Sequence, residues 1–482
     1  MNLRLIFNIF FLIGLNLLIK PFWSLGIDVE VQNQVGHQVY GSYQALLSLS
    51  LIFSILLDLG IQTFNSRQVA SSPKTFQSLF PNMMIAKLFL AVIYMGLISL
   101  VAYLLNYRGR EIYLLGLIGF MQVAVSYLLF VRSNIAALQR FNLDSFLSVL
   151  DKLIAISLCG YFLYVKPDLI TFSIFHFAAF QVIGYAVTLL IGWGLTYRLF
   201  TFKWSGFNFS RLRVIMKKGV PYAALVFFMG IYARTDIILL DIMFDKSSIQ
   251  SGVYAASYRL LDLSNNMLGV LIAGILMPLF VKMLAEKERL NGVLKMVSTF
   301  MLGASLWIAF WVYFYDVNIV SILYDHNTEQ TVQVLGVLIW VLPISSLSYI
   351  YSTLLTAGGH LRFLIIRAVF SGFVSVLLNL ILIPYYGAIG AAIVSVITHA
   401  LYVGSVILRV KKIHNFVFPF QFLIRIIVWS IITIFSFVIL KKFYPEEWIL
   451  VSLLVAVISL ITIVLFGGVS WKVLKQMISK SK

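Results

Sequence analysis

The chain has 482 residues, of which 61% are hydrophobic and 11% charged, and its mean hydropathy is +0.98. Such a composition excludes a soluble globular domain. The formal net charge of +18 would suit a nucleic-acid-binding protein, but the positions of the basic residues along the chain argue against that class. Apolar runs of about 20 residues recur, which is the length that an α-helix needs to cross the hydrocarbon core of a membrane.

The sequence therefore predicts an all-α membrane protein with about 14 transmembrane helices, because a helix satisfies its own backbone hydrogen bonds inside lipid. Segment 4–26 has no small-residue cleavage site and is expected to be retained as the first helix. The loops between the spans are short. The expected spans are 4–26, 40–60, 79–105, 112–132, 146–165, 169–195, 218–242, 252–280, 293–316, 332–356, 363–383, 387–409, 422–440 and 448–467.

The topology follows from the basic residues. If the N-terminus is cytoplasmic, most of the 36 Lys and Arg residues fall in cytoplasmic ends and loops. Acidic residues, among them Asp28, Glu30 and Glu446, fall mainly on the other side. This asymmetry is the positive-inside pattern, and it predicts that both termini are cytoplasmic. The basic charge therefore reports membrane topology, and nucleic acid is not an expected partner.

The chain also resembles itself. A shift of 214 positions places Lys20 on Arg234 and segment 39–50 on segment 253–264, where six of the twelve pairs are identical. An even number of spans per repeat predicts two pseudo-symmetric six-helix lobes of the same orientation, followed by two extra helices. The expected divisions are an N-terminal lobe at 1–200, a basic cytoplasmic linker at 201–217, a C-terminal lobe at 218–411, and two extra transmembrane helices with a basic cytoplasmic tail at 412–482.

Four cations inside the spans are candidate substrate-binding residues. Lys20 and Arg234 occupy equivalent positions of the two repeats, and an intramembrane cation usually faces a water-filled path or an anionic partner. Paired cations would suit the passage of an anion, with Arg holding it in bidentate fashion and Lys as a point charge. Lys87 and Arg259 are further candidates. For each of the four, snorkelling to the surface or pairing with a carboxylate is the alternative.

Four carboxylates are candidates for coupling transport to a proton or sodium ion, because an aspartate whose solvation changes between two states can bind and release a cation. They are Asp58, Asp236, Asp241 and Asp262. Capping or interfacial hydration is the alternative for Asp58 and Asp241, which lie near span ends. Arg259 and Asp262 are three residues apart on one helix, so an ion pair between them is also expected.

Several classes of function lack the residues that they need. The single Cys159 is isolated, and no His, Cys and Glu cluster has metal-ligand spacing, so no metal or cofactor is expected. No Walker sequence is present, so ATP is not the expected direct energy source. A polysaccharide polymerase or ligase would need a sizeable loop on the far side of the membrane. The sequence shows none, and an enzyme is not expected.

Several strings of the chain resemble the bacterial polysaccharide and O-antigen flippases of the multidrug/oligosaccharidyl-lipid/polysaccharide exporter superfamily. They occur in the expected order and cover nearly the whole chain. The strings are Val39-Tyr40-Gly41, Leu57-Asp58-Leu59-Gly60, Gly219-Val220-Pro221, Arg234-Thr235-Asp236, Gly252-Val253-Tyr254 and the segment 379–392.

The resemblance implies a two-lobed bacterial inner-membrane transporter that works by alternating access. Its expected substrate is a polyprenyl-pyrophosphate-linked oligosaccharide, which would move from the cytoplasmic to the periplasmic leaflet with its headgroup held by buried cations. An ion-coupled multidrug or small-molecule antiporter of the same superfamily is the alternative. Closure of two lobes within one chain favours a monomer whose partners are its lipid-linked substrate and the membrane lipid.

Overall fold

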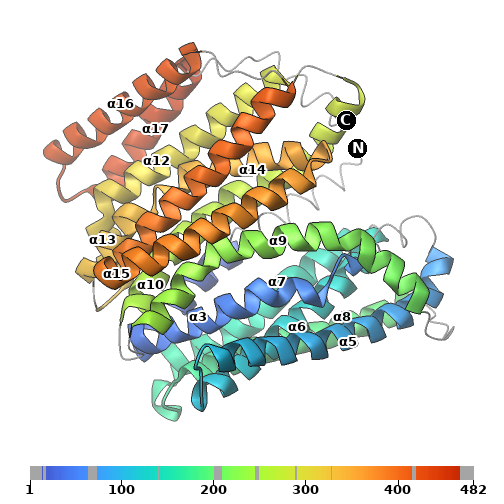
Figure 1. Ribbon diagram of the computed structural model, residues 1–482. Helices are drawn as coiled ribbons and strands as arrows, with labels where there is room; N and C mark the ends of the chain where they lie inside the picture. The colour runs from blue at the N-terminus through green and yellow to red at the C-terminus, as the bar shows by residue number, and fades with distance from the viewer. Residues whose placement is uncertain are drawn as a thin grey trace. The chain divides into compact units, whose positions relative to one another are not determined.

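The fold is all-α. The computed structural model describes residues 14, 18–62, 73–138, 140–199, 209–244, 249–287, 290–326, 328–414 and 420–466, and every regular element in these ranges is helical (Figure 1). This confirms the predicted fold class. The chain forms two compact units, unit 1 (Met1–Ala255) and unit 2 (Ala256–Lys482).

Unit 1 is built on long helices. In it, α6 packs against α3 and α8, α7 packs on α8, and α3 packs on α9. One apolar core cluster joins α5 to α6 through the stacked rings of Phe80 and Phe130, with centroids 5.4 Å apart. The elements are η1 (Phe22–Asp28), α2 (Val29–Val35), α3 (His37–Phe53), η2 (Ser54–Leu57), α5 (Pro73–Leu104), α6 (Arg110–Ala137), α7 (Phe141–Gly160), η3 (Tyr161–Val165), η4 (Pro167–Leu169), α8 (Ile174–Leu199) and α9 (Phe209–Met243).

The first span is longer than the sequence predicts. Its helix continues past residue 26 through a π-helical stretch and α2, and it ends at Gly36, whose φ of 83° is a backbone conformation that favours glycine. Hydropathy ends the span early because residues 28–34 are largely polar. These polar groups are satisfied within unit 1: buried Gln32 donates a hydrogen bond to the Gly252 carbonyl at 2.9 Å, and Tyr40 donates to Asp28 at 2.7 Å.

Helices α3 and α9 approach each other at both ends through glycines. At one end, Gly252, which follows α9 at the start of α10 (Gln250–Asn265), lies against the start of α3. A Cβ on Gly252 would lie 1.9 Å from the carbonyl oxygen of His37. A Cβ on Gly41 would lie 2.2 Å from the Ser251 hydroxyl. Only glycine allows the two backbones to come this close.

At the other end, the turn after η2 meets the body of α9. A Cβ on Gly219 would lie 2.1 Å from the carbonyl oxygen of Leu59, and one on Gly60 would lie 2.8 Å from the Cα of Gly219. Both Leu59 and Gly60 have positive φ. The strings that carry the family resemblance therefore contact one another in pairs, although they are far apart in the sequence. These contacts place α9, which the predicted division assigns to the second lobe, in unit 1. The division itself stays a prediction.

Unit 2 begins within α10, which continues without a break into η5 (Asn266–Val270) and α11 (Leu271–Ala285). Helix α14 packs against α11, α12 and α15, and α16 pairs with α17 and contacts α12. The elements that follow α10 are η5 (Asn266–Val270), α11 (Leu271–Ala285), α12 (Asn291–Leu323), α13 (Thr328–Leu338), α14 (Val341–Ala357), α15 (Leu361–His414), α16 (Phe420–Phe443) and α17 (Trp448–Phe466).

Helix α15 is two antiparallel segments joined at a sharp turn. Gly387 has φ 55° and ψ −134°, which no helix adopts. As a result, the Arg409 guanidinium lies 5.3 Å from the ring centroid of Phe363, 46 residues earlier in the chain. Figure 1 shows the two segments side by side in orange. They correspond to the predicted spans 363–383 and 387–409.

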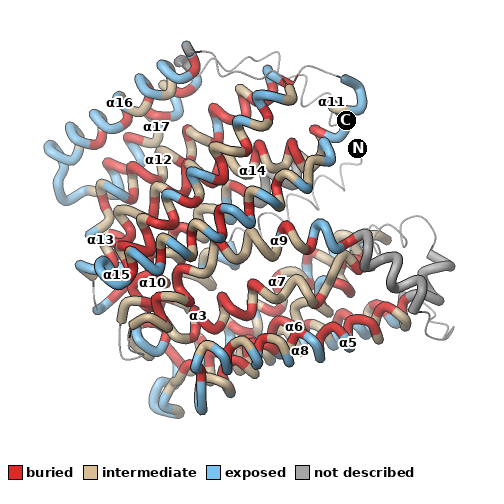
Figure 2. Tube along the Cα trace, viewed as in Figure 1, coloured by how far each residue is buried: buried red, intermediate tan, exposed pale blue. Residues whose placement is uncertain are grey.

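Ten helices of the described ranges are long and apolar enough to cross a membrane, with Leu361–His414 counted once. Two shorter apolar helices are Leu276–Ala285 and Trp448–Val464. Burial differs among them (Figure 2): 61% of the apolar window of Asn291–Leu323 is buried within the protein, but only 17% of that of Gln421–Phe443. Much of α16 is therefore apolar surface that suits contact with lipid.

Candidate substrate and coupling sites

Lys20 lies in a group of charges in unit 1. It is 15 residues before the helix end at Val35, which at 1.5 Å per residue places it about 22 Å from that end, and its side chain is exposed. The charges that act on it are Arg132 on α6 and Asp151 and Lys152 on α7. Three cations thus lie near one another, and we call Lys20, Arg132 and Lys152 the cation cluster.

Lys152 is held mainly by aromatic rings. Its ammonium lies 4.6 Å from the ring centroid of Trp23 and 5.0 Å from that of Tyr185. Trp23 is itself fixed by stacking on Phe177, with centroids 5.6 Å apart and planes 9° from parallel. Rings stabilise a cation through their quadrupole without cancelling its charge, and the carboxylates of Asp151 and Asp28 also act on this ammonium.

Arg132 is the cation of the cluster that has a direct carboxylate partner. Its Nε donates to Asp144 Oδ1 at 2.7 Å, and both side chains are partly exposed. This geometry orients the guanidinium and leaves its terminal nitrogens for other partners. The internal repeat singles out Lys20, because it aligns with Arg234. It does not single out Arg132 and Lys152, whose proximity depends on the packing of α6, α7 and the first helix.

Arg234 lies on α9, nine residues before its end at Met243. It is half-buried, and its side chain has no hydrogen-bond or ion-pair partner among the described residues. The charges that act on Lys20 do not include it. The two equivalent cations of the repeats are therefore in different environments, one in a cluster and one without a partner in the described part of the chain.

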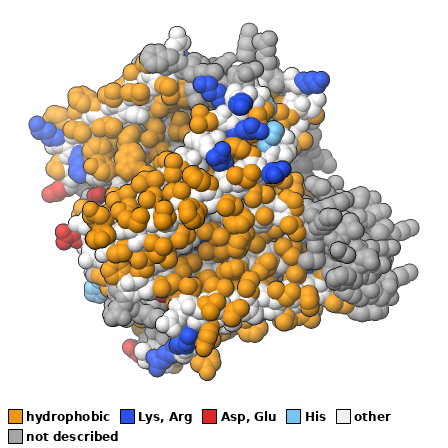
Figure 3. Space-filling model, in the orientation of Figure 1, with side chains coloured by type: hydrophobic (Ala, Val, Ile, Leu, Met, Phe, Trp, Pro, Cys, Tyr) orange, Lys and Arg blue, Asp and Glu red, His pale blue; other side chains and the backbone are white. Residues whose placement is uncertain are grey.

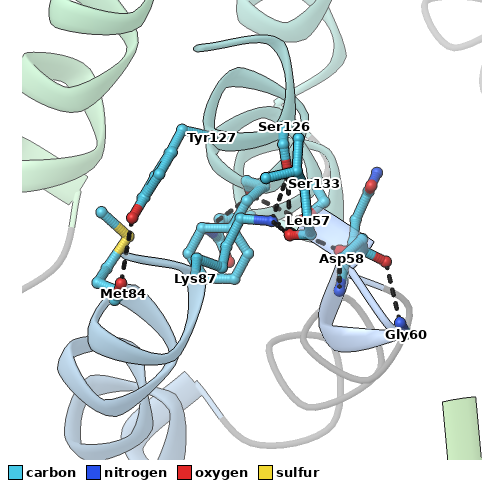
Figure 4. A network of polar contacts seen from close by, with 11 residues as sticks. Leu57, Asp58, Gly60, Met84, Lys87, Ser126, Tyr127 and Ser133 are labelled. Atoms are coloured by element: carbon cyan, nitrogen blue, oxygen red, sulfur yellow. Dashed lines mark hydrogen bonds and ion pairs between the residues drawn. The ribbon is translucent and has the colours of Figure 1, made fainter. Parts of the chain in front are cut away.

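Lys87 is buried, with 1% of its side chain exposed, and its ammonium is fully engaged (Figure 4). It donates to the Leu57 carbonyl at 2.8 Å and to the Ser126 hydroxyl at 2.7 Å, and it lies 3.6 Å from Asp58 Oδ1. These contacts tie α5 to η2 and α6. A role of Lys87 in substrate binding stays a prediction. Its hydrogen bonds and ion pair stabilise the packing of α5 on η2 and α6.

Asp58 holds the turn after η2. Its carboxylate accepts hydrogen bonds from the backbone N–H of Gly60 at 3.2 Å and of Gln62 at 3.0 Å. This is the capping arrangement that the sequence suggests as the alternative for this residue. Because Gly60 contacts Gly219, the Lys87–Asp58 pair supports one end of the α3–α9 contact.

Asp241 is buried at the end of α9 and accepts hydrogen bonds from three hydroxyls. The donors are Tyr107 at 2.8 Å, Ser42 at 2.9 Å and Ser251 at 3.3 Å. Tyr107 lies in the turn between α5 and α6, and burial and the nearby Asp241 carboxylate raise the pKa of its phenol. The phenol therefore stays protonated and remains a donor at neutral pH.

Asp236, the other buried carboxylate of α9, accepts a hydrogen bond from Tyr254 at 2.9 Å. In unit 2, the buried Arg259 donates to the Tyr324 hydroxyl at 2.7 Å, and Asp262 accepts from Asn266 at 3.0 Å. The carboxylates and cations that the sequence singles out are thus distributed over several sites.

Comparisons with known proteins agree with this architecture. The family model described as Polysaccharide biosynthesis protein matches residues 5–284, more than half of the chain. The chain belongs to this family. No curated protein matches it in sequence.

The family member shares its fold with solved transporters. One is described as lipid II flippase MurJ in an inward closed conformation: it has 14% identity and a TM-score of 0.73, with 95% of this chain and 98% of that chain covered. Two others are multidrug resistance MATE family transporters of the MOP superfamily. The inward-facing one has 13% identity and a TM-score of 0.65, with 82% and 94% covered. The outward-facing one has 14% identity and a TM-score of 0.59, with 85% and 94% covered.

Proposed function

We propose that this protein is a flippase that moves a polyprenyl-pyrophosphate-linked oligosaccharide from the cytoplasmic to the periplasmic leaflet of a bacterial inner membrane by alternating access. Both termini would be cytoplasmic, as the distribution of Lys and Arg favours. The family to which the chain belongs supports a task in polysaccharide biosynthesis. The fold that it shares with MurJ and MATE transporters supports transport over catalysis.

The observation that carries the proposal is the cation cluster. A pyrophosphate headgroup has to pass through a low-dielectric interior, where fixed cations lower its energy. Exposed Lys20 and half-buried Lys152 supply positive charge, and Arg132 supplies a planar donor held at 2.7 Å by Asp144. Arg234, which lacks a partner in the described part of the chain, is the further cation that we assign to the headgroup.

Ion coupling is the second part of the proposal. Asp241 joins α9 to α3 and to the α5–α6 turn through its three donors. Separation of α3 from α9 would break these hydrogen bonds and expose the carboxylate to water, where it can bind a proton or sodium ion. Asp236 is a second candidate for this role.

An ion-coupled multidrug antiporter is the alternative function, and the buried carboxylates Asp236 and Asp241 favour it. MATE transporters of the same fold are among the similar structures. Such a protein would attract cationic drugs to its carboxylates, whereas the cation cluster would repel them. The proposed substrate therefore fits the charge of unit 1 better.

A reconstituted assay tests the proposal. The purified protein is placed in vesicles that contain a fluorescent polyprenyl-pyrophosphate-linked sugar. A membrane-impermeant quencher added outside quenches the sugar of the outer leaflet only, so the remaining fluorescence measures the sugar that is still in the inner leaflet. We expect faster loss with the protein than in empty vesicles, and no uptake of a cationic dye in parallel vesicles that carry a proton gradient. Dye transport without movement of the lipid-linked sugar would establish the antiporter instead.

A further inference from the structure

A second cationic site lies in unit 2 and shares no residue with the cation cluster. It is formed where the two antiparallel segments of α15 bring their ends together. The Arg367 guanidinium lies 5.2 Å from the ring centroid of Phe363, and the Arg409 guanidinium lies 5.3 Å from the same ring. Both guanidinium groups therefore lie within cation–π distance of one aromatic ring.

Neither guanidinium has a carboxylate partner among the residues that the structure describes. The ion pairs seen in the described part of the chain, Lys87–Asp58 and Arg132–Asp144, lie elsewhere. The Nε atoms of Arg367 and Arg409 are buried and without a hydrogen-bond partner, and so is Nε2 of His414. The two arginine Nε–H groups are donors, and buried donors are costly to leave unsatisfied, so the pair indicates a missing acceptor.

The surroundings add further positive charge. Arg362, Lys411 and Lys412 are exposed at the same ends of the α15 segments. Figure 3 shows Lys and Arg side chains gathered over this end of the α15 segments.

The depth of the site suits the headgroup region of a bilayer. Arg367 is six residues from the start of α15 at Leu361, and Arg409 is five residues from its end at His414. At 1.5 Å per residue, both lie about 8–9 Å inside the helix ends. This is the depth of the interfacial layer, and the predicted topology places this end on the cytoplasmic side, where anionic lipids attract basic residues.

We propose that Phe363, Arg367, Arg409 and His414 form a binding site for the phosphodiester headgroup of an anionic phospholipid of the surrounding membrane. The phosphate oxygens would accept hydrogen bonds from the buried Nε atoms, and the acyl chains would lie along the exposed apolar surface of α15, which includes Ile366 and Phe370. The residues of this site differ from those of the proposed headgroup site in unit 1. The proposal does not depend on which substrate the protein transports.

Thermal unfolding of the purified full-length protein in vesicles tests this proposal. We expect phosphatidylglycerol to raise the unfolding midpoint by several degrees over phosphatidylcholine, since a ligand bound only to the folded state stabilises it. The variant Arg367→Gln/Arg409→Gln should lose this shift. The matched variant Arg362→Gln/Lys412→Gln, which removes the same charge from the exposed surface, should keep it. If phosphatidylglycerol raised the unfolding midpoint equally in all three proteins, the proposed lipid site would be wrong.

Inorganic pyrophosphate in phosphatidylcholine vesicles separates a lipid from the transported headgroup. If pyrophosphate reproduces the full shift in the wild-type protein, the site belongs to the substrate and the phospholipid assignment is wrong. Should the double variant fail to fold, the single variant Arg409→Lys keeps the charge but loses the planar donor. Native mass spectrometry should then show less phosphatidylglycerol co-purified with it than with the wild-type protein, and equal amounts would contradict the proposal.

Discussion

At the scale of single residues, the most informative finding is how differently the intramembrane cations are stabilised. Lys152 lies over two aromatic rings, Lys87 is surrounded by oxygen acceptors, and Arg132 has one carboxylate. Only a cation whose charge is not neutralised locally can attract an anion strongly. On this ground we assign Lys87 to structure and Lys152 to substrate, whereas Arg132 joins the substrate site through the guanidinium nitrogens that Asp144 leaves available.

Lys152→Gln should slow flipping without unfolding the protein. The loss of one cation from the cation cluster should reduce transport at least about tenfold, equivalent to roughly 1.4 kcal/mol. Lys152→Arg keeps the charge and stacks on Trp23 and Tyr185, so it should retain most of the activity. The vesicle assay measures both rates. Equal activity of the Gln and Arg variants would remove Lys152 from the site.

Lys87→Met should act on stability instead. It leaves the Leu57 carbonyl and Asp58 without their buried partner, which should cost about 1–3 kcal/mol and lower the midpoint of thermal unfolding. Lys442→Met, at an exposed position, is the control and should change the midpoint little. If Lys87→Met unfolds like the wild type but fails to transport, then Lys87 belongs to the substrate path.

At the scale of elements, the α3–α9 contact combines close glycine packing with buried hydrogen bonds. Its two ends are set by Gly252 against His37 and by Gly219 against Leu59. Asp241 and its donors join the helices near the first of these ends. A contact that depends on such close approach is either fully made or lost, which suits a gate that opens as a unit.

Gly252→Ala should open this gate. The new Cβ would overlap the His37 carbonyl, so α3 and the start of α10 have to separate. The readout is labelling of Ser42→Cys by an impermeant maleimide, in a Cys159→Ser background. We expect several-fold faster labelling with Gly252→Ala. Gly230→Ala is the matched control, because its Cβ would lie 3.6 Å from Ile52, an ordinary contact. Slow labelling in both variants would contradict the prediction that this contact closes access to residue 42.

The sequence predicts the helices better than their contacts. Hydropathy locates the spans, but it ends the first one near residue 26, because the helix that continues to Val35 is polar and is buried by tertiary hydrogen bonds. The strings with Gly41, Gly60, Gly219 and Gly252 are visible as family features, yet nothing in the sequence shows that they pair. The sequence does not single out Lys152 either, because its aromatic partners Trp23 and Tyr185 lie on other helices and only tertiary packing brings them together.

At the scale of the whole molecule, the two units contain different charge sites. Unit 1 holds the cation cluster and the Asp241 hydrogen bonds, and unit 2 holds Arg259 with Tyr324 and the arginine pair of α15. The long apolar helices and the family to which the chain belongs support a membrane transporter. We therefore propose substrate binding in unit 1 and lipid binding in unit 2.

The most direct test of the central claim is the sidedness of the lipid-linked oligosaccharide in cells that lack this protein. We predict that it accumulates on the cytoplasmic leaflet, that the wild-type protein clears it, and that Lys20→Ala/Lys152→Ala does not, although this variant reaches the membrane in equal amounts. Clearance by the variant would refute the cation cluster as the headgroup site. A normal leaflet distribution in cells without the protein would contradict the flippase assignment itself.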